Sequence, residues 1–176
     1  MIDTPQIKLT SHVSLSSNGR GGIWLPIILG TIAIGILLSG IFSGATGLFG
    51  DSGTVTFGSK VHEGGRDLAR LFVFSILLLL ALRFFSWKIQ KSYGNITLAA
   101  LRCLAIVACI EAVRVAQIPH GLMRVVLLIS TQYVLFGILI FGLFTVTIRE
   151  SVLFVTGCTV AAGLLWIGAY VGIWIT

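Results

Sequence analysis

Long apolar runs alternate with short polar connections along this chain, and the pattern predicts membrane-spanning helices. The apolar runs cover approximately residues 23–43, 68–87, 97–118, 125–148 and 151–176. A helix needs about 20 mainly apolar residues to cross a bilayer, and the first, fourth and fifth runs contain no charged residue. The second run is bracketed by Arg70 and Arg83, and the third contains Arg102, Glu111 and Arg114. We therefore expect about five transmembrane helices, or four if the second or third run does not span.

The continuity of these runs predicts an all-α integral membrane protein. Only helices or closed barrels can cross lipid, and the strands of a barrel alternate apolar and polar residues. Composition agrees, because 56% of the residues are hydrophobic and 10% are charged, against about 25% charged residues in a soluble domain. We expect one transmembrane domain over residues 23–176, preceded by a polar N-terminal arm over residues 1–22.

Basic residues cluster in the connection between the second and third runs, "RFFSWKIQKSYGN". It contains Arg83, Lys88 and Lys91 without an acidic residue, and Arg102 follows shortly afterwards. Cytoplasmic loops are enriched in Lys and Arg, so we expect this connection and the N-terminus on the cytoplasmic side and the C-terminus outside. The formal net charge is +6. We expect the basic residues to set the membrane topology and to contact lipid headgroups, and we expect no nucleic-acid partner. The same four residues are candidates for contacts with headgroups or with one anionic lipid.

Glu111 and Arg114 place two charges within the third apolar run. Residues three apart on a helix are neighbours, so the two side chains can form an ion pair. The fourth run is expected to be antiparallel and to bring Gln132 and Tyr133 to the depth of Glu111. This intramembrane polar cluster has two interpretations, a structural lock between helices or a site for a proton, an ion or a ligand. A carboxylate paired with arginine suits a lock better than a proton carrier.

Small residues recur at four-residue spacing in the first and fifth runs. Such spacing lets helices approach closely in lipid, where packing drives association. The residues predicted to form helix-packing faces are Gly35, Ser39, Gly40, Gly44, Gly168 and Gly172. These faces can contact other helices of the same chain or helices of another subunit.

The sequence lacks the residues that are characteristic of several functional classes. The histidines, His12, His62 and His120, lie outside the deep apolar positions, so a pair of intramembrane haem ligands is not expected. The sequence has no phosphate-binding glycine loop after a strand and no nucleophile elbow. We therefore expect no catalysis, no cofactor and no metal ion.

Two functions are compatible with these features. The first is a non-catalytic accessory subunit of a larger membrane complex, which the glycine faces, the small soluble parts and the charge-free last run favour. The alternative is a small oligomeric transporter or channel that uses the polar cluster around Glu111. Both functions predict membrane lipids as partners, together with other membrane protein subunits or further copies of the same chain.

Overall fold

Within its described residues the chain forms five helices and no β-strand. The computed structural model describes residues 22–43, 57–92, 94–113 and 122–175, so most of the predicted N-terminal arm lies outside the described residues. The helices are α1 (Trp24–Ser43), α2 (Phe57–Lys88), α3 (Ile96–Ala112), α4 (Leu122–Leu143) and α5 (Ile148–Ile175). The predicted all-helical class is confirmed.

Four of the helices, α1, α2, α4 and α5, are long and apolar enough to cross a membrane. Helix α3 differs because its 17 residues rise about 26 Å at about 1.5 Å per residue. The hydrocarbon core of a bilayer is about 30 Å thick. The part of the predicted third run that follows Val113 lies outside the described residues.

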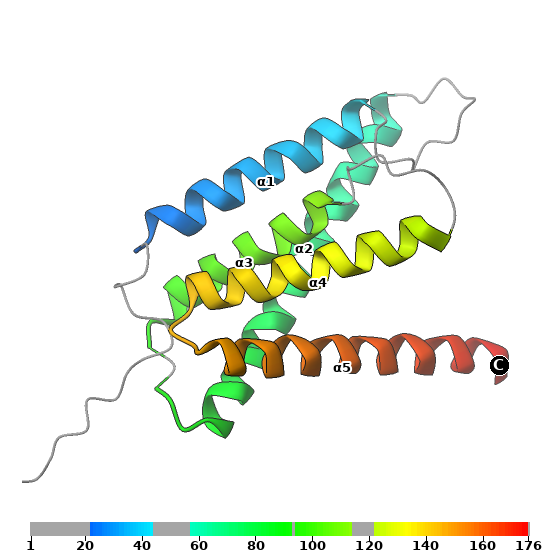
Figure 1. The fold of residues 1–176 in the computed structure, drawn as a ribbon. Coiled ribbons are helices and arrows are strands. Elements are labelled where there is room, and N and C mark those ends of the chain that lie inside the picture. Colours follow the sequence, from blue (N-terminus) through cyan, green and yellow to red (C-terminus); the bar gives the residue numbers. More distant parts are fainter. Residues whose placement is uncertain (1–21, 44–56, 93, 114–121, 176) are drawn as a thin grey trace, which may run out of the picture.

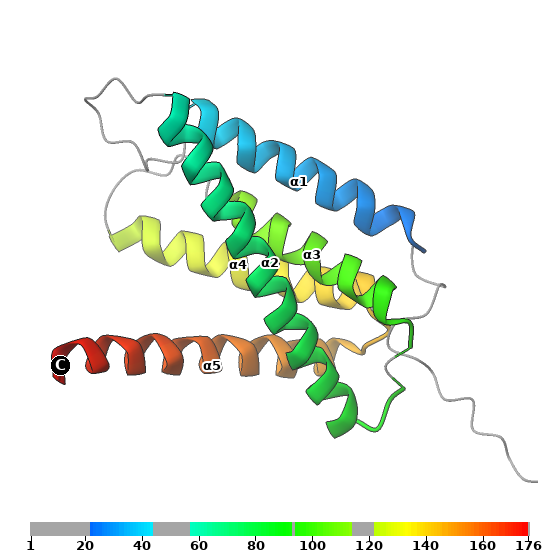
Figure 2. The ribbon, with the colours of Figure 1, turned by 180° about the vertical axis from the view of Figure 1, so that it is seen from behind.

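Helix α3 lies at the centre of the bundle, in contact with α1, α2 and α4. Helices α1, α3 and α5 run in one direction, and α2 and α4 run in the other (Figure 1). Seen from behind, α2 crosses in front of the other helices at a steep angle (Figure 2). The four consecutive residues of α3 from Ala105 to Ala108 are all buried. Because successive residues point about 100° apart around a helix, α3 is enclosed on nearly every side.

Helix α1 lies close to α3 at Gly30. A Cβ atom added there would lie 3.6 Å from the Cα and Cβ atoms of Ala105. The buried residues of α1 follow helical spacing and form one stripe, which comprises Pro26, Gly30, Ala33, Leu37, Gly40 and Ile41. Gly35 and Ser39 are exposed, so α1 packs within the chain through a face different from the one they occupy.

Helix α2 begins at Phe57, well before the apolar run predicted from residue 68. Its first turns are stabilised by an ion pair of 2.8 Å between Arg66 Nη2 and Glu63 Oε2. In addition, Lys60 Nζ donates a hydrogen bond of 2.7 Å to the carbonyl of Phe42 near the end of α1. These contacts hold a polar segment in the helix that the apolar pattern does not reveal.

Gly64 and Gly65 are the reason that this segment resembles a loop in sequence, because glycine pairs usually mark turns. Gly64 is buried within α2, and a Cβ atom there would lie 3.9 Å from the side chain of Leu38 on α1. The small residue therefore allows α1 and α2 to approach each other at this depth.

The α4–α5 turn lies earlier in the chain than the apolar pattern predicts. The fourth run was expected to extend to Ile148, but α4 ends at Leu143. A capping box starts α5, in which the Thr147 amide donates to Glu150 Oε2 over 2.8 Å and the Glu150 amide donates to Thr147 Oγ1 over 3.3 Å. The sequence Thr-Ile-Arg-Glu has the Thr-x-x-Glu spacing of this motif, so α5 begins at Ile148 and not near Ser151.

The close approach at Gly30 predicts a difference between two glycines of α1. Gly30→Leu should lower the free energy of unfolding by about 1–3 kcal/mol, because the added atoms have no space against α3. Gly35→Leu should change it by no more than about 0.5 kcal/mol, since no atom lies within 4 Å of a Cβ at Gly35. Unfolding of the two variants by denaturant titration in detergent measures both values. Equal effects would contradict the close contact of α1 with α3.

Candidate functional site

The two ends of the bundle differ in chemistry, and we name them by the helices that form them. At the mixed-charge end α2 begins and α3 ends, and at the basic end α2 and α4 finish while α3 and α5 begin. The mixed-charge end holds the predicted residue Glu111. Its Oε1 atom lies 3.4 Å from Arg70 Nη2 on α2. The side chain of Glu111 is 12% exposed and that of Arg70 is 44% exposed, so the pair links two helices at the edge of the core.

The other residues of the predicted polar cluster are placed separately. Gln132 on α4 donates its amide Nε2 to the carbonyl of Ile110 over 3.1 Å, and that carbonyl is one of the last four of α3, which lack partners within the helix. The hydroxyl of Tyr133 hydrogen bonds to Thr156 Oγ1 on α5 over 2.7 Å. Arg114 lies outside the described residues. Gln132 thus contacts the residue that precedes Glu111 on α3. Tyr133 instead links α4 to α5.

Arg70 and Asp67 are polar residues of this region that the sequence analysis did not select. Both lie near the start of the apolar part of α2, and antiparallel packing of α2 on α3 brings that depth close to the end of α3. This reasoning could have suggested Arg70 as a partner for Glu111. Asp67 is 7% exposed and lies on the same buried stripe of α2 as Leu71. The buried face of α2 therefore includes an acidic side chain.

Arg102 is completely buried, unlike the other basic residues predicted to contact headgroups. Its guanidinium carbon lies 5.7 Å from the centroid of the Phe144 ring, which follows the last residue of α4. A helix C-terminus carries a partial negative charge, and the face of an aromatic ring attracts cations. These two features favour an arginine inside the bundle, whereas Arg83 and Lys88 are exposed on its surface.

Charge is distributed unequally between the two ends. Among residues with described side chains, the mixed-charge end has three basic and three acidic residues, which are Lys60, Arg66, Arg70, Glu63, Asp67 and Glu111. The basic end has five basic residues and one acidic residue, which are Arg83, Lys88, Lys91, Arg102, Arg149 and Glu150. The acidic residue is engaged, since Glu150 Oε2 lies 2.7 Å from Lys91 Nζ. The basic end therefore has a large excess of positive charge.

The predicted helix-packing residues are mostly on surfaces that the chain leaves open. Gly40 is buried in α1, but Gly35, Ser39 and Gly168 are exposed. No atom lies within 4 Å of a Cβ placed at Gly35 or Gly168. The remaining two residues, Gly44 and Gly172, lie where side-chain surroundings are not described.

No cluster of three or more His, Cys, Asp or Glu side chains that could hold a metal ion occurs in the described part of the chain. Comparisons with protein-family models, with curated proteins and with solved structures find no match. The two ends of the bundle thus differ in their geometry, with an ion pair that links helices at one end and exposed basic side chains at the other.

The Arg70–Glu111 pair predicts coupled effects of mutation. Arg70→Met and Glu111→Gln should each destabilise the bundle, and the double variant should be less destabilised than the sum of the two. Exposed pairs contribute up to about 1 kcal/mol, and breaking buried pairs costs about 3–5 kcal/mol. Because Arg70 is partly exposed, we expect a coupling energy of about 1–2 kcal/mol. A double-mutant cycle of unfolding free energies measures it, and additive effects would show that the two side chains do not interact.

Proposed function

We propose that this chain is a five-span membrane protein that serves as a non-catalytic accessory subunit of a larger membrane assembly. The helical bundle and its apolar surface support membrane insertion, and the enclosed position of α3 supports a fifth span. Helix α3 carries two charged residues, which makes its own insertion unfavourable. It would be stabilised by the neighbours that surround it.

The observation that carries the subunit proposal is the free half of α5, which we define as residues 157–168. Every residue with a described side chain in this half is exposed except Cys158, which is partly buried. The hydrogen bonds of α5 with α4, between Tyr133 and Thr156 and between Ser151 and Gly137, lie nearer its start. Over these three turns Cys158 is the one described side chain that packs against the hydrophobic core, so this part of α5 has fewer contacts within the chain than its start.

The composition of this free half favours a protein partner over lipid alone. It includes Gly157, Ala161, Ala162 and Gly163, and no atom lies within 4 Å of a Cβ placed at either glycine. Small residues gather where helices meet in membranes, because they allow close backbone approach. A second transmembrane helix fits such a surface better than disordered acyl chains do.

The alternative, a transporter or channel built around Glu111, gains less support from the geometry. The carboxylate is engaged by Arg70 across two helices, which suits a structural link between α2 and α3. Gln132 also contacts the backbone of α3, and this contact fixes the position of α4. We therefore assign the polar cluster a structural role within the proposed subunit.

The charge distribution predicts the orientation of the chain in its membrane. Basic segments remain on the cytoplasmic side, so the basic end should face the cytoplasm. Cysteine introduced at Ser92 should be labelled by an impermeant thiol reagent only from the cytoplasmic side, and cysteine at Gly58 only from outside. The native cysteines should first be replaced by serine or alanine. The reverse pattern would overturn the orientation, and labelling of both positions from one side would remove α2 as a span.

The accessory role predicts a heteromeric complex that depends on α5. The tagged full-length protein, purified from native membranes in mild detergent, should carry one or more other membrane proteins in fixed ratio. Gly163→Leu should release these partners while the chain stays inserted and helical, because a large side chain blocks close helix approach. Gly142→Leu on α4 is the matched control, since that glycine is also exposed with open space around it. Recovery of the wild-type chain only as a homo-oligomer would favour the transporter or channel.

A further inference from the structure

The last turns of α2 expose two basic side chains and two aromatic rings on the same side of the helix. Arg83 and Trp87 are four residues apart, as are Phe84 and Lys88, and residues at this spacing are neighbours on a helix surface. All four side chains are exposed. The rings of Phe84 and Trp87 contact each other with centroids 5.9 Å apart.

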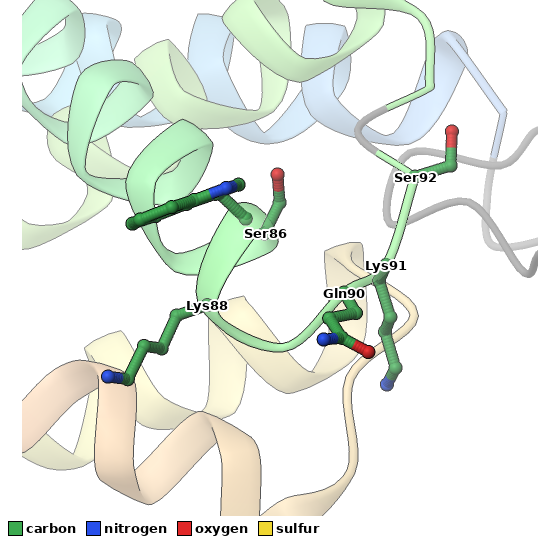
Figure 3. A pocket seen from close by; sticks show the side chains of 6 residues that line it. Ser86, Lys88, Gln90, Lys91 and Ser92 are labelled. Carbon is green, nitrogen blue, oxygen red and sulfur yellow. The ribbon is translucent and has the colours of Figure 1, made fainter.

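The α2–α3 turn adds a hollow beside this surface. It has a volume of about 580 Å³ and is lined by Ser86, Trp87, Lys88, Gln90, Lys91 and Ser92 (Figure 3). In Figure 3 the side chains of Lys88, Gln90 and Lys91 extend to one side of the turn, and those of Ser86 and Ser92 extend to the other. On the side of Lys88, Gln90 and Lys91 the hollow thus combines ammonium and amide donors, and these groups bind phosphate oxygens.

Lys91 fixes the position of the turn and leaves Lys88 available. Its Nζ atom is 2.7 Å from Glu150 Oε2 at the start of α5, so its charge is already compensated. Lys88 and Arg83 form no ion pair with any described residue and are both exposed. These two side chains therefore supply the uncompensated positive charge of the surface.

The backbone of the α2–α3 turn satisfies carbonyl groups at the end of α2 that would otherwise repel an anion. Free carbonyl groups at such an end repel anions. Here the amide of Lys91 donates to the carbonyl of Ser86 over 3.1 Å, and the amide of Gln90 donates to that of Trp87 over 3.3 Å. Gln90 has a φ of 55°, so the turn is a Schellman motif. Two of the last carbonyls are thereby satisfied, and side-chain donors dominate the hollow.

We propose that the end of α2 and the α2–α3 turn bind the headgroup of an anionic phospholipid, with Arg83 and Lys88 contacting its phosphate. The aromatic pair distinguishes this ligand from free phosphate, because Trp and neighbouring rings prefer the boundary between headgroups and acyl chains. Phe84 would then lie against the upper acyl chain while Gln90, which extends to the same side of the turn as Lys88, donates to headgroup oxygens. This site requires membrane insertion but does not depend on the accessory-subunit role.

The proposal is tested with the full-length protein in nanodiscs that contain phosphatidylcholine and a minor fraction of phosphatidylglycerol. Native mass spectrometry measures the ratio of the two lipids that remain bound on release from the nanodisc. The wild-type protein should retain phosphatidylglycerol preferentially. Each basic residue near a membrane surface strengthens anionic lipid binding roughly fivefold, so Arg83→Gln with Lys88→Gln should reduce the preference by more than tenfold.

Two further variants separate a specific site from a general effect of charge. Lys60→Gln with Arg66→Gln removes the same charge from the mixed-charge end and should leave the preference unchanged. Arg83→Lys with Lys88→Arg keeps the charge and should retain most of the binding. Equal losses in both charge-removing variants would overturn the proposal, as would loss in the charge-preserving variant. Displacement of the lipid by millimolar inorganic phosphate would also overturn it, because the ligand would then be phosphate alone.

Discussion

Burial of charge on α3 is the constraint around which the other helices are arranged. Arg102 and Glu111 are nine residues apart, which places them on opposite sides of the helix. An uncompensated ion in an apolar interior costs several kcal/mol, so each side needs a suitable neighbour. The end of α4 and the Phe144 ring supply one, and Arg70 on α2 supplies the other. Helix α1 completes the enclosure through its close approach at Gly30.

The helical class could be predicted from the sequence because it depends on runs of apolar residues, but the rotation of each helix about its own axis could not. Glu111 forms an ion pair with Arg70 from another helix, whereas Arg114, the partner predicted from its spacing in the sequence, lies outside the described residues. Such a contact depends on how each helix is rotated about its axis. Helix α1 is apolar all round, so small-residue spacing alone cannot select the buried face that contains Gly30 over the exposed one that contains Gly35.

The starts of α2 and α5 were mispredicted for a different reason. The predicted bounds followed the runs of apolar residues and did not use the local capping and turn signals. The capping box of Thr147 and Glu150 marks the start of α5, yet the preceding turn is as apolar as the helices that it joins. Conversely, the start of α2 contains adjacent glycines and resembles a loop. There, the tertiary contacts of Lys60 and Gly64 with α1 stabilise the helix. Propensity is a weak guide where such packing decides.

The contacts of α5 are concentrated in its first turns, and this explains how its free half can keep a defined direction. Glu150 is bound to Lys91, and Ser151 Oγ donates to the carbonyl of Gly137 over 2.9 Å. Phe154 contacts the rings of Phe85 and Phe136, with centroids 5.0 and 6.2 Å away. A helix held at one end by three other segments presents its remaining turns without a large loss of conformational freedom. Since ordering costs reduce affinity, the proposed partner helix would meet a surface on α5 that is already positioned for binding.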